Sequence, residues 1–114
     1  MRPWWPSALA LVAVAAQPAI AGGPTPDIAG GPTPDPAGLA NLVRQDCGSC
    51  HGLTLKGGLG KPLTADRLRH WDRAQLIHII LDGVPGTPMP AWRPLLTEAE
   101  AAWIANALKT GTLP

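Results

Sequence analysis

Two cysteines and a histidine stand together in the run Cys47-Gly48-Ser49-Cys50-His51. Thiols at this spacing can each form a thioether to one edge of a porphyrin, and the adjoining His can place an imidazole nitrogen on the iron. The pattern therefore predicts one covalently attached haem c, held by Cys47 and Cys50, with His51 as an axial ligand.

Three other chemistries use cysteines at this spacing: a plain disulfide, a thioredoxin-like dithiol and half of a zinc site. A zinc site needs a second ligand pair, and the chain has only two cysteines. A thioredoxin-like dithiol belongs in a βαβ pattern, which the sequence lacks. A disulfide leaves the role of His51 unexplained.

Met89 is the leading candidate for the sixth iron ligand, because Met1 is the only other methionine. It lies between Pro88 and Pro90, and a neutral thioether in this stiff segment would favour ferrous iron and raise the reduction potential. The alternative role for Met89 is to fill a gap in the core. His70 and His78 are rival ligands, but both lie off the apolar helical positions and are expected at the surface.

A histidine that binds iron usually donates its other ring N–H to a carbonyl, which fixes the ring. We expect the Pro62 carbonyl to accept this hydrogen bond from His51. The alternative is that Pro62 only closes a glycine-rich turn.

The elements that must position these residues are helices and loops, so the fold class is all-α. Apolar spacing predicts a helix over 39–46, a second over 72–81 that stops at Gly83, and a third that begins after Thr97. Glycine and proline predict loops over 52–65 and 83–92. Thr97 and Glu100 form a capping-box pattern, and the third helix should run to about Lys109 and end at Gly111.

The N-terminal third of the chain is expected to lie outside this domain. Residues 1–21 have the parts of a secretory signal peptide, with cleavage expected after Ala21, although an uncleaved anchor is the alternative. Residues 22–36 contain two copies of a Gly/Pro-rich repeat and predict a linker. The domain is then 37–114, exported to the periplasm, and not inserted in the membrane once the signal is removed.

Charge gives little sign of a large polyanionic partner. From residue 37 onward there are eight Lys or Arg and six Asp or Glu, without a dense basic run. We expect a monomer that does not bind nucleic acid and that meets redox proteins through a local patch.

The stretch from Ala37 to Leu113 resembles a class I cytochrome c, on the strength of Cys47-x-x-Cys50-His51, the loop with Pro62, the Met89 segment and the C-terminal helix. The runs 46–60 and 81–92 are similar to the small monohaem cytochromes of denitrification gene clusters, the NirC type. This implies a small class I fold, with three main helices around one covalent haem. The doubled Gly-Pro-Thr-Pro linker departs from that family.

The resemblance implies an electron-transfer protein rather than an enzyme. Its partners would be an upstream donor and the periplasmic nitrite reductase that carries haem c and haem d-one. The alternative is a redox role in maturing haem d-one or its reductase. A third hypothesis, an open iron site for ligands or catalysis, depends on Met89 not binding iron. We expect Lys56, Lys61 and Arg93 to ring the exposed haem edge.

Overall fold

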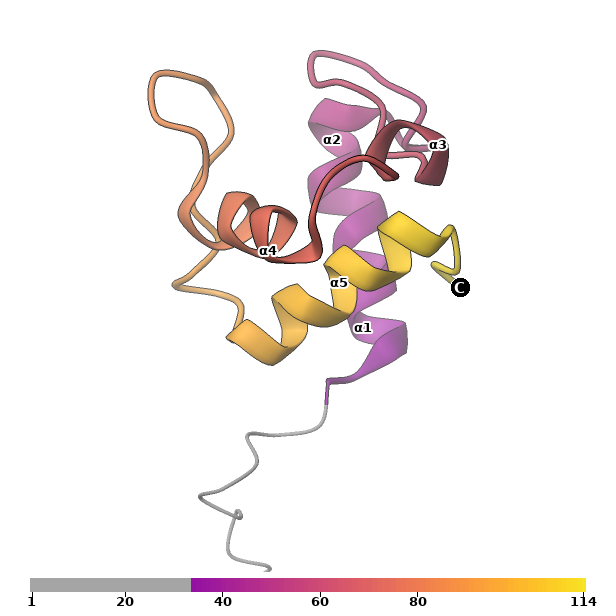
Figure 1. Cartoon of the computed structure of the whole chain (residues 1–114), viewed down its shortest axis with the longest axis vertical. Helices are drawn as coiled ribbons and strands as arrows, with labels where there is room; N and C mark the ends of the chain where they lie inside the picture. The colour runs from indigo at the N-terminus through magenta and orange to yellow at the C-terminus, as the bar shows by residue number, and fades with distance from the viewer. Residues whose placement is uncertain (1–33) are drawn as a thin grey trace, which may run out of the picture.

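The computed structural model describes residues 34–114, and in that part of the chain every regular element is helical (Figure 1). The prediction of an all-α fold is therefore confirmed. The predicted signal peptide and most of the predicted linker lie outside the described residues. The elements in chain order are α1 (Pro36–Leu42), a π-helical segment η1 (Val43–Cys47), α2 (Gly48–His51), α3 (Ala65–Leu68), α4 (Arg73–Asp82) and α5 (Glu98–Thr110).

The first helix is longer than the predicted 39–46. It begins at Pro36, which has no backbone N–H to leave unpaired, and the Asp35 carboxylate accepts hydrogen bonds from the next free amides. Of the residues assigned to the linker, Pro36 therefore belongs to this helix and Asp35 caps it. Elements α1, η1 and α2 follow one another without a break, so the cysteine motif lies on the helix itself.

Helices α4 and α5 begin and end within one residue of the predicted positions. Asp72 caps α4 in a capping box with Gln75, and Gly83 ends it. Thr97 caps α5 in a capping box with Glu100, and Gly111 ends that helix in the left-handed conformation.

The short helix α3 was not predicted, because its four residues follow a glycine-rich loop and show no clear periodicity. A long-range contact holds its end in place. The Lys109 ammonium, on the last turn of α5, donates hydrogen bonds to the carbonyls of Leu68, Arg69 and Trp71.

Helix α5 is the centre of the core and packs against α1, α3 and α4. Its buried face includes Ile104, Ala107 and Leu108, which recur at helical spacing, whereas Trp103 is only half-buried. Ala101 and Ala105 are fully buried and permit close approach of the neighbouring helices, while Ala102 is half-buried.

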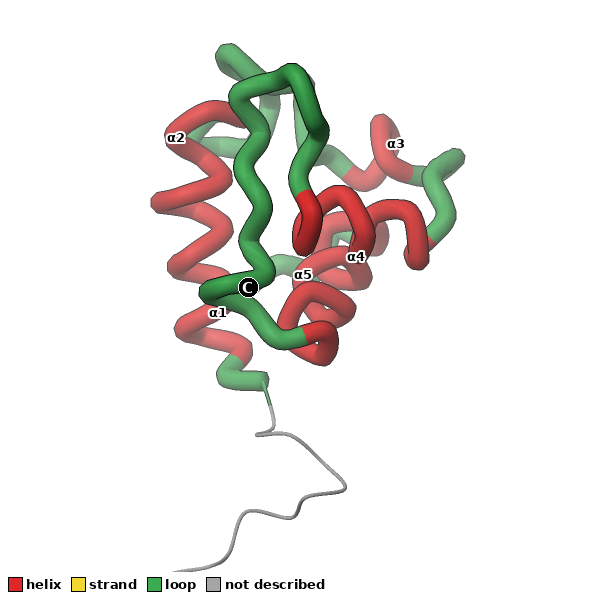
Figure 2. Tube along the Cα trace, turned by 90° about the vertical axis from the view of Figure 1, so that its left-hand side faces the viewer, coloured by secondary structure: helices red, strands yellow, loops and turns green. Residues whose placement is uncertain are grey.

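Two loops rise at the same end of the molecule. In Figures 1 and 2 the loop after α2 and the loop after α4 both extend toward the top, and Figure 2 shows the second loop nearest the viewer, with α1 and α2 to its left and α4 to its right. The fold thus brings the segments that carry His51 and Met89 to one end of the bundle. None of the helices within 34–114 is long and apolar enough to cross a bilayer.

Candidate functional site

The two thiols occupy the last turns of the long first helix. Cys47 is half-buried and Cys50 is exposed, and both are free thiols. The turn is supported by the Ser49 hydroxyl, which donates a hydrogen bond of 2.7 Å to the Asp46 carbonyl. Because the residues are three apart on a helix, both thiols can face one ligand edge.

The environment of Cys47 does not suit a redox dithiol. Burial, with the nearby charge of Asp46, raises the pKa of the Cys47 thiol to about 11. Reactive cysteines of thioredoxin-like sites have a lowered pKa, which increases the thiolate. The dithiol alternative is therefore disfavoured by the electrostatics of this site.

The imidazole of His51 is fixed from one side. Its Nδ1 lies 2.6 Å from the carbonyl oxygen of Lys61. Since a carbonyl can only accept, Nδ1 carries the proton, and Nε2 keeps the lone pair that can bind iron. The prediction that the Pro62 carbonyl accepts this hydrogen bond was wrong, because the acceptor is the carbonyl of the preceding residue, Lys61. Lys61 precedes a proline, which favours extended backbone geometry at the residue whose carbonyl accepts this bond.

The glycine-rich loop is closed against the end of α2 by backbone hydrogen bonds. Gly60 N–H donates to the Cys50 carbonyl and Gly57 N–H donates to the His51 carbonyl, each at 2.8 Å. A Cβ on Gly60 would lie 2.6 Å from both Cε1 and Nδ1 of His51. Only glycine permits this approach. In the sequence, the run of glycines before Pro62 indicates a loop that can approach another group closely, but it does not show that Gly60 is the residue that meets the ring.

Met89 is half-buried in a loop that is closed on itself. Val84 N–H donates to the Met89 carbonyl at 3.2 Å, and Met89 N–H donates to the Thr87 hydroxyl at 3.3 Å. The sequence predicted a non-helical segment here, and the structure confirms that it is not helical. The prolines restrict this backbone, and the Thr87 hydroxyl adds hydrogen bonds that the sequence did not reveal.

The rival histidines lie at the surface. His70 is exposed beside Trp71, with ring centroids 6.2 Å apart. His78 is exposed and its Nδ1 lies 2.9 Å from an Asp82 carboxylate oxygen. Of the cations expected around the haem edge, Lys56 and Lys61 are exposed, whereas Arg93 is paired with Asp82.

The residues at this end of the bundle fit a haem c. Free thiols at the right spacing, an imidazole with Nε2 available and a nearby thioether loop make up the donor set. A porphyrin also needs apolar cover, and Leu59 and Val84 are large apolar side chains open to solvent. Leu59 adjoins Gly60 at the His51 ring. Val84 lies in the loop 83–92 that carries Met89, called the Met89 loop below.

Comparisons with known proteins agree with this fit. The family model described as cytochrome c oxidase, cbb3-type, subunit III matches residues 34–106. Cytochrome c55X of Paracoccus denitrificans is 53% identical over 103 residues, which cover 90% of this chain and 93% of that protein. Cytochrome c55X of Pseudomonas aeruginosa is 49% identical over 75 residues, covering 66% of this chain and 63% of that protein.

Two solved structures are also similar. The c-type cytochrome NirC superposes with a TM-score of 0.67 at 48% identity, covering 68% of this chain and 91% of that one. The dihydro-haem d1 dehydrogenase NirN, solved in complex with DHE, superposes with a TM-score of 0.58 at 33% identity, covering 66% of this chain. The present chain spans only 16% of NirN.

Family membership implies covalently bound haem c and a role in electron transfer. The fold, the placement of the cysteine motif and the relatives lead to the same assignment. The chain belongs to the class I c-type cytochromes, and within them to the NirC type.

Proposed function

We propose that this protein is a periplasmic one-electron carrier with a single haem, bound through thioethers at Cys47 and Cys50 and with His51 and Met89 as axial ligands. The observation that carries the proposal is the orientation of His51. Its Nδ1 donates to the Lys61 carbonyl at 2.6 Å, which leaves the lone pair of Nε2 available to bind iron.

The bound haem supplies reversible exchange of one electron between ferrous and ferric iron. The protein sets how readily that exchange occurs. The hydrogen bond from His51 to Lys61 makes the imidazole a better electron donor and holds its plane. The neutral thioether of Met89 favours the ferrous form, and its closed loop limits movement when the iron changes charge.

The physiological acceptor that we propose is the nitrite reductase with haem c and haem d-one, in denitrification. The support is the similarity to NirC and to the c55X cytochromes. Export by residues 1–21 and cleavage after Ala21 would place the carrier with that reductase. Intact-mass measurement of the exported protein tests the cleavage, since the mature chain should begin at Gly22.

Spectroscopy tests the ligands. The exported holoprotein should retain haem on a denaturing gel, and the ferric form should show a sulfur-to-iron charge-transfer band. Met89→Ala should remove that band and lower the reduction potential, whereas His70→Ala and His78→Ala should leave both unchanged. A band that survives in Met89→Ala would exclude Met89 as the ligand.

Stopped-flow mixing with the nitrite reductase tests the partner. If the two proteins meet by charge steering, the reaction should be fast and should slow as salt screens the surfaces. A slow reaction at every salt concentration would argue against this acceptor.

A second candidate is suggested by NirN, part of which resembles this chain. Removing two hydrogen atoms from a dihydro-haem releases two electrons and two protons, so two molecules of a monohaem carrier would be needed to accept the electrons. In this role the protein would serve maturation of haem d-one. Rapid reduction of the ferric carrier by such a dehydrogenase, with no reaction toward nitrite reductase, would favour the second candidate.

A further inference from the structure

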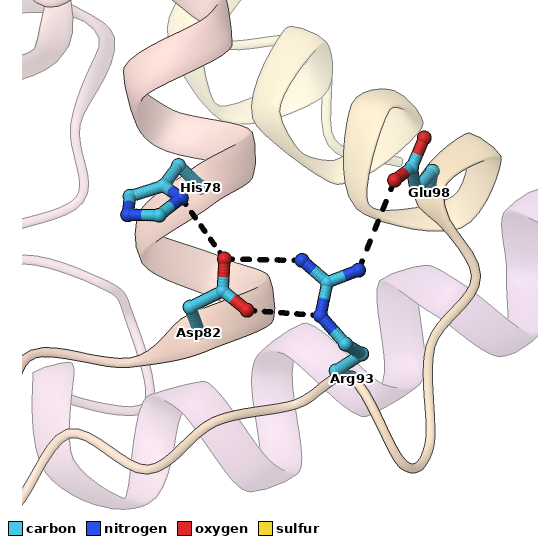
Figure 3. Close-up of polar contacts among 4 residues, drawn as sticks. All are labelled: His78, Asp82, Arg93 and Glu98. Carbon is cyan, nitrogen blue, oxygen red and sulfur yellow. Dashed lines mark hydrogen bonds and ion pairs between the residues drawn. The ribbon is translucent and has the colours of Figure 1, made fainter.

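The base of the Met89 loop is closed by an ion pair between Asp82, the last residue of α4, and Arg93, just after the loop. The two groups meet at two points: Arg93 Nε donates to Asp82 Oδ1 at 2.9 Å, and Nη2 donates to Oδ2 at 3.0 Å (Figure 3). A paired contact of this kind fixes the direction as well as the distance of the guanidinium.

Backbone contacts join the same two segments. Trp92 N–H donates to the Ile80 carbonyl at 3.1 Å, and Arg93 N–H donates to the Leu81 carbonyl at 3.0 Å. The last carbonyls of a helix have no partner within it, so the returning chain completes the end of α4. The side-chain pair and the backbone pair therefore hold the loop at one place.

The pair is also fixed to its surroundings. His78 Nδ1 lies 2.9 Å from Asp82 Oδ2, and Glu98 at the start of α5 lies 3.8 Å from Arg93 Nη1. Hydrogen bonding from Arg93, above all, lowers the pKa of the Asp82 carboxyl. The charged groups that face the pair thus come from both α4 and α5 (Figure 3).

Exposed ion pairs add little to global stability, so the effect of this pair should be local. Its two residues bracket the loop, and Val84 and Met89 are already joined by a backbone hydrogen bond within it. We propose that Asp82 and Arg93 are positioning residues that hold the Met89 loop so that its thioether stays on the iron. This inference rests on the proposed function, because it requires Met89 to be a ligand.

The test compares Asp82→Asn with Asp66→Asn in the exported holoprotein. Asp66 is paired with Arg69 at 3.6 Å, is exposed, and lies outside the loop, so its variant makes the same change in net charge. Two quantities are measured: amide hydrogen exchange of Trp92 and Arg93, and the pH at which the charge-transfer band is lost in an alkaline titration.

Asp82→Asn should raise the exchange rate of those amides by a factor of about 2 to 5, the range that an exposed ion pair supports. The pH of band loss should fall by about 0.3 to 0.7, the logarithm of that factor. Asp66→Asn should match the wild type, and Asp82→Glu should recover most of the effect. Arg93→Lys, which keeps the charge but loses the two-point contact, should lie between wild type and Asp82→Asn and gives a second test if Asp82→Asn does not fold.

The failures are distinguishable. A wild-type ferric protein without the band contradicts Met89 ligation, and with it the proposed function. A wild-type protein with the band, together with Asp82→Asn and Asp66→Asn variants that both behave like it, overturns only the positioning role. Equal weakening in both Asn variants would show a general charge effect and would also overturn it.

Discussion

Substitution of Gly83 by Ala should damage the Met89 loop more than substitution at any neighbouring glycine. Gly83 has φ 68° and ψ −169°, a conformation that is nearly restricted to glycine. A Cβ there would lie 2.7 Å from the Met89 carbonyl oxygen, 2.8 Å from the Ala91 nitrogen and 2.8 Å from the Pro90 carbonyl carbon. All three atoms are backbone, so the loop itself must move.

The magnitude follows from two effects. Backbone strain contributes about 1 to 3 kcal/mol, and the steric overlap contributes about 1 to 3 kcal/mol more. Gly86 is the matched control, because it also has positive φ, at 77°, but a Cβ there would have nothing within 4 Å. Gly86→Ala should therefore cost only strain, about 1 to 2 kcal/mol.

The assay is thermal unfolding of both holoproteins, with the ferric charge-transfer band recorded in each. One kcal/mol corresponds to about 4 to 8 °C in a domain of this size. With an overlap of about 2 kcal/mol, Gly83→Ala should melt roughly 8 to 16 °C below Gly86→Ala. The band should weaken only in Gly83→Ala. Equal melting temperatures with intact bands would refute the close approach of the loop to Gly83.

Three further results are expected. Thr97→Ala removes the N-cap of α5 and should cost about 1 kcal/mol in denaturant unfolding, with no change in the visible spectrum. In the haem-free protein at pH 8, half-buried Cys47, whose pKa is raised to about 11, should alkylate more slowly than exposed Cys50; equal rates would contradict the burial. Because Arg93 lowers the pKa of Asp82 below its ordinary 3.8, the stability from this pair is complete above that value and is lost as pH falls through the lowered pKa. Asp82→Asn should therefore lose less stability than wild type in acid unfolding below about pH 4, and identical acid curves would be the contrary outcome.

The sequence predicted most of the helical architecture because the signals are local. The Thr97–Glu100 capping box, the Gly83 stop and the apolar face that contains Ile104 each depend on residues a few positions apart. Helix α3 was missed for the opposite reason. Its position depends on Lys109, some 40 residues away, and no local pattern carries that contact.

At the site, residue types were predictable but contacts were not. The cysteine motif and the Met89 segment follow from chemistry and spacing. Whether the Lys61 or the Pro62 carbonyl accepts the hydrogen bond from His51 depends on the path of the loop over the imidazole ring. A shift of that path by one residue would change the acceptor. The pairing of Asp82 with Arg93 likewise needs the loop between them to return to α4, and the sequence gives no distance for that return.

The π-helical segment Val43–Cys47 has a consequence for how relatives of different length align. Gly48 N–H donates to the Val43 carbonyl five residues back, so this turn holds one residue more than an α-helical turn. A chain shorter by one residue here could close an ordinary α-turn, keep the upstream helix packed on α5, and still present the cysteine motif in the same direction. In an alignment, such a chain would differ by a single gap, placed inside a helix rather than in a loop.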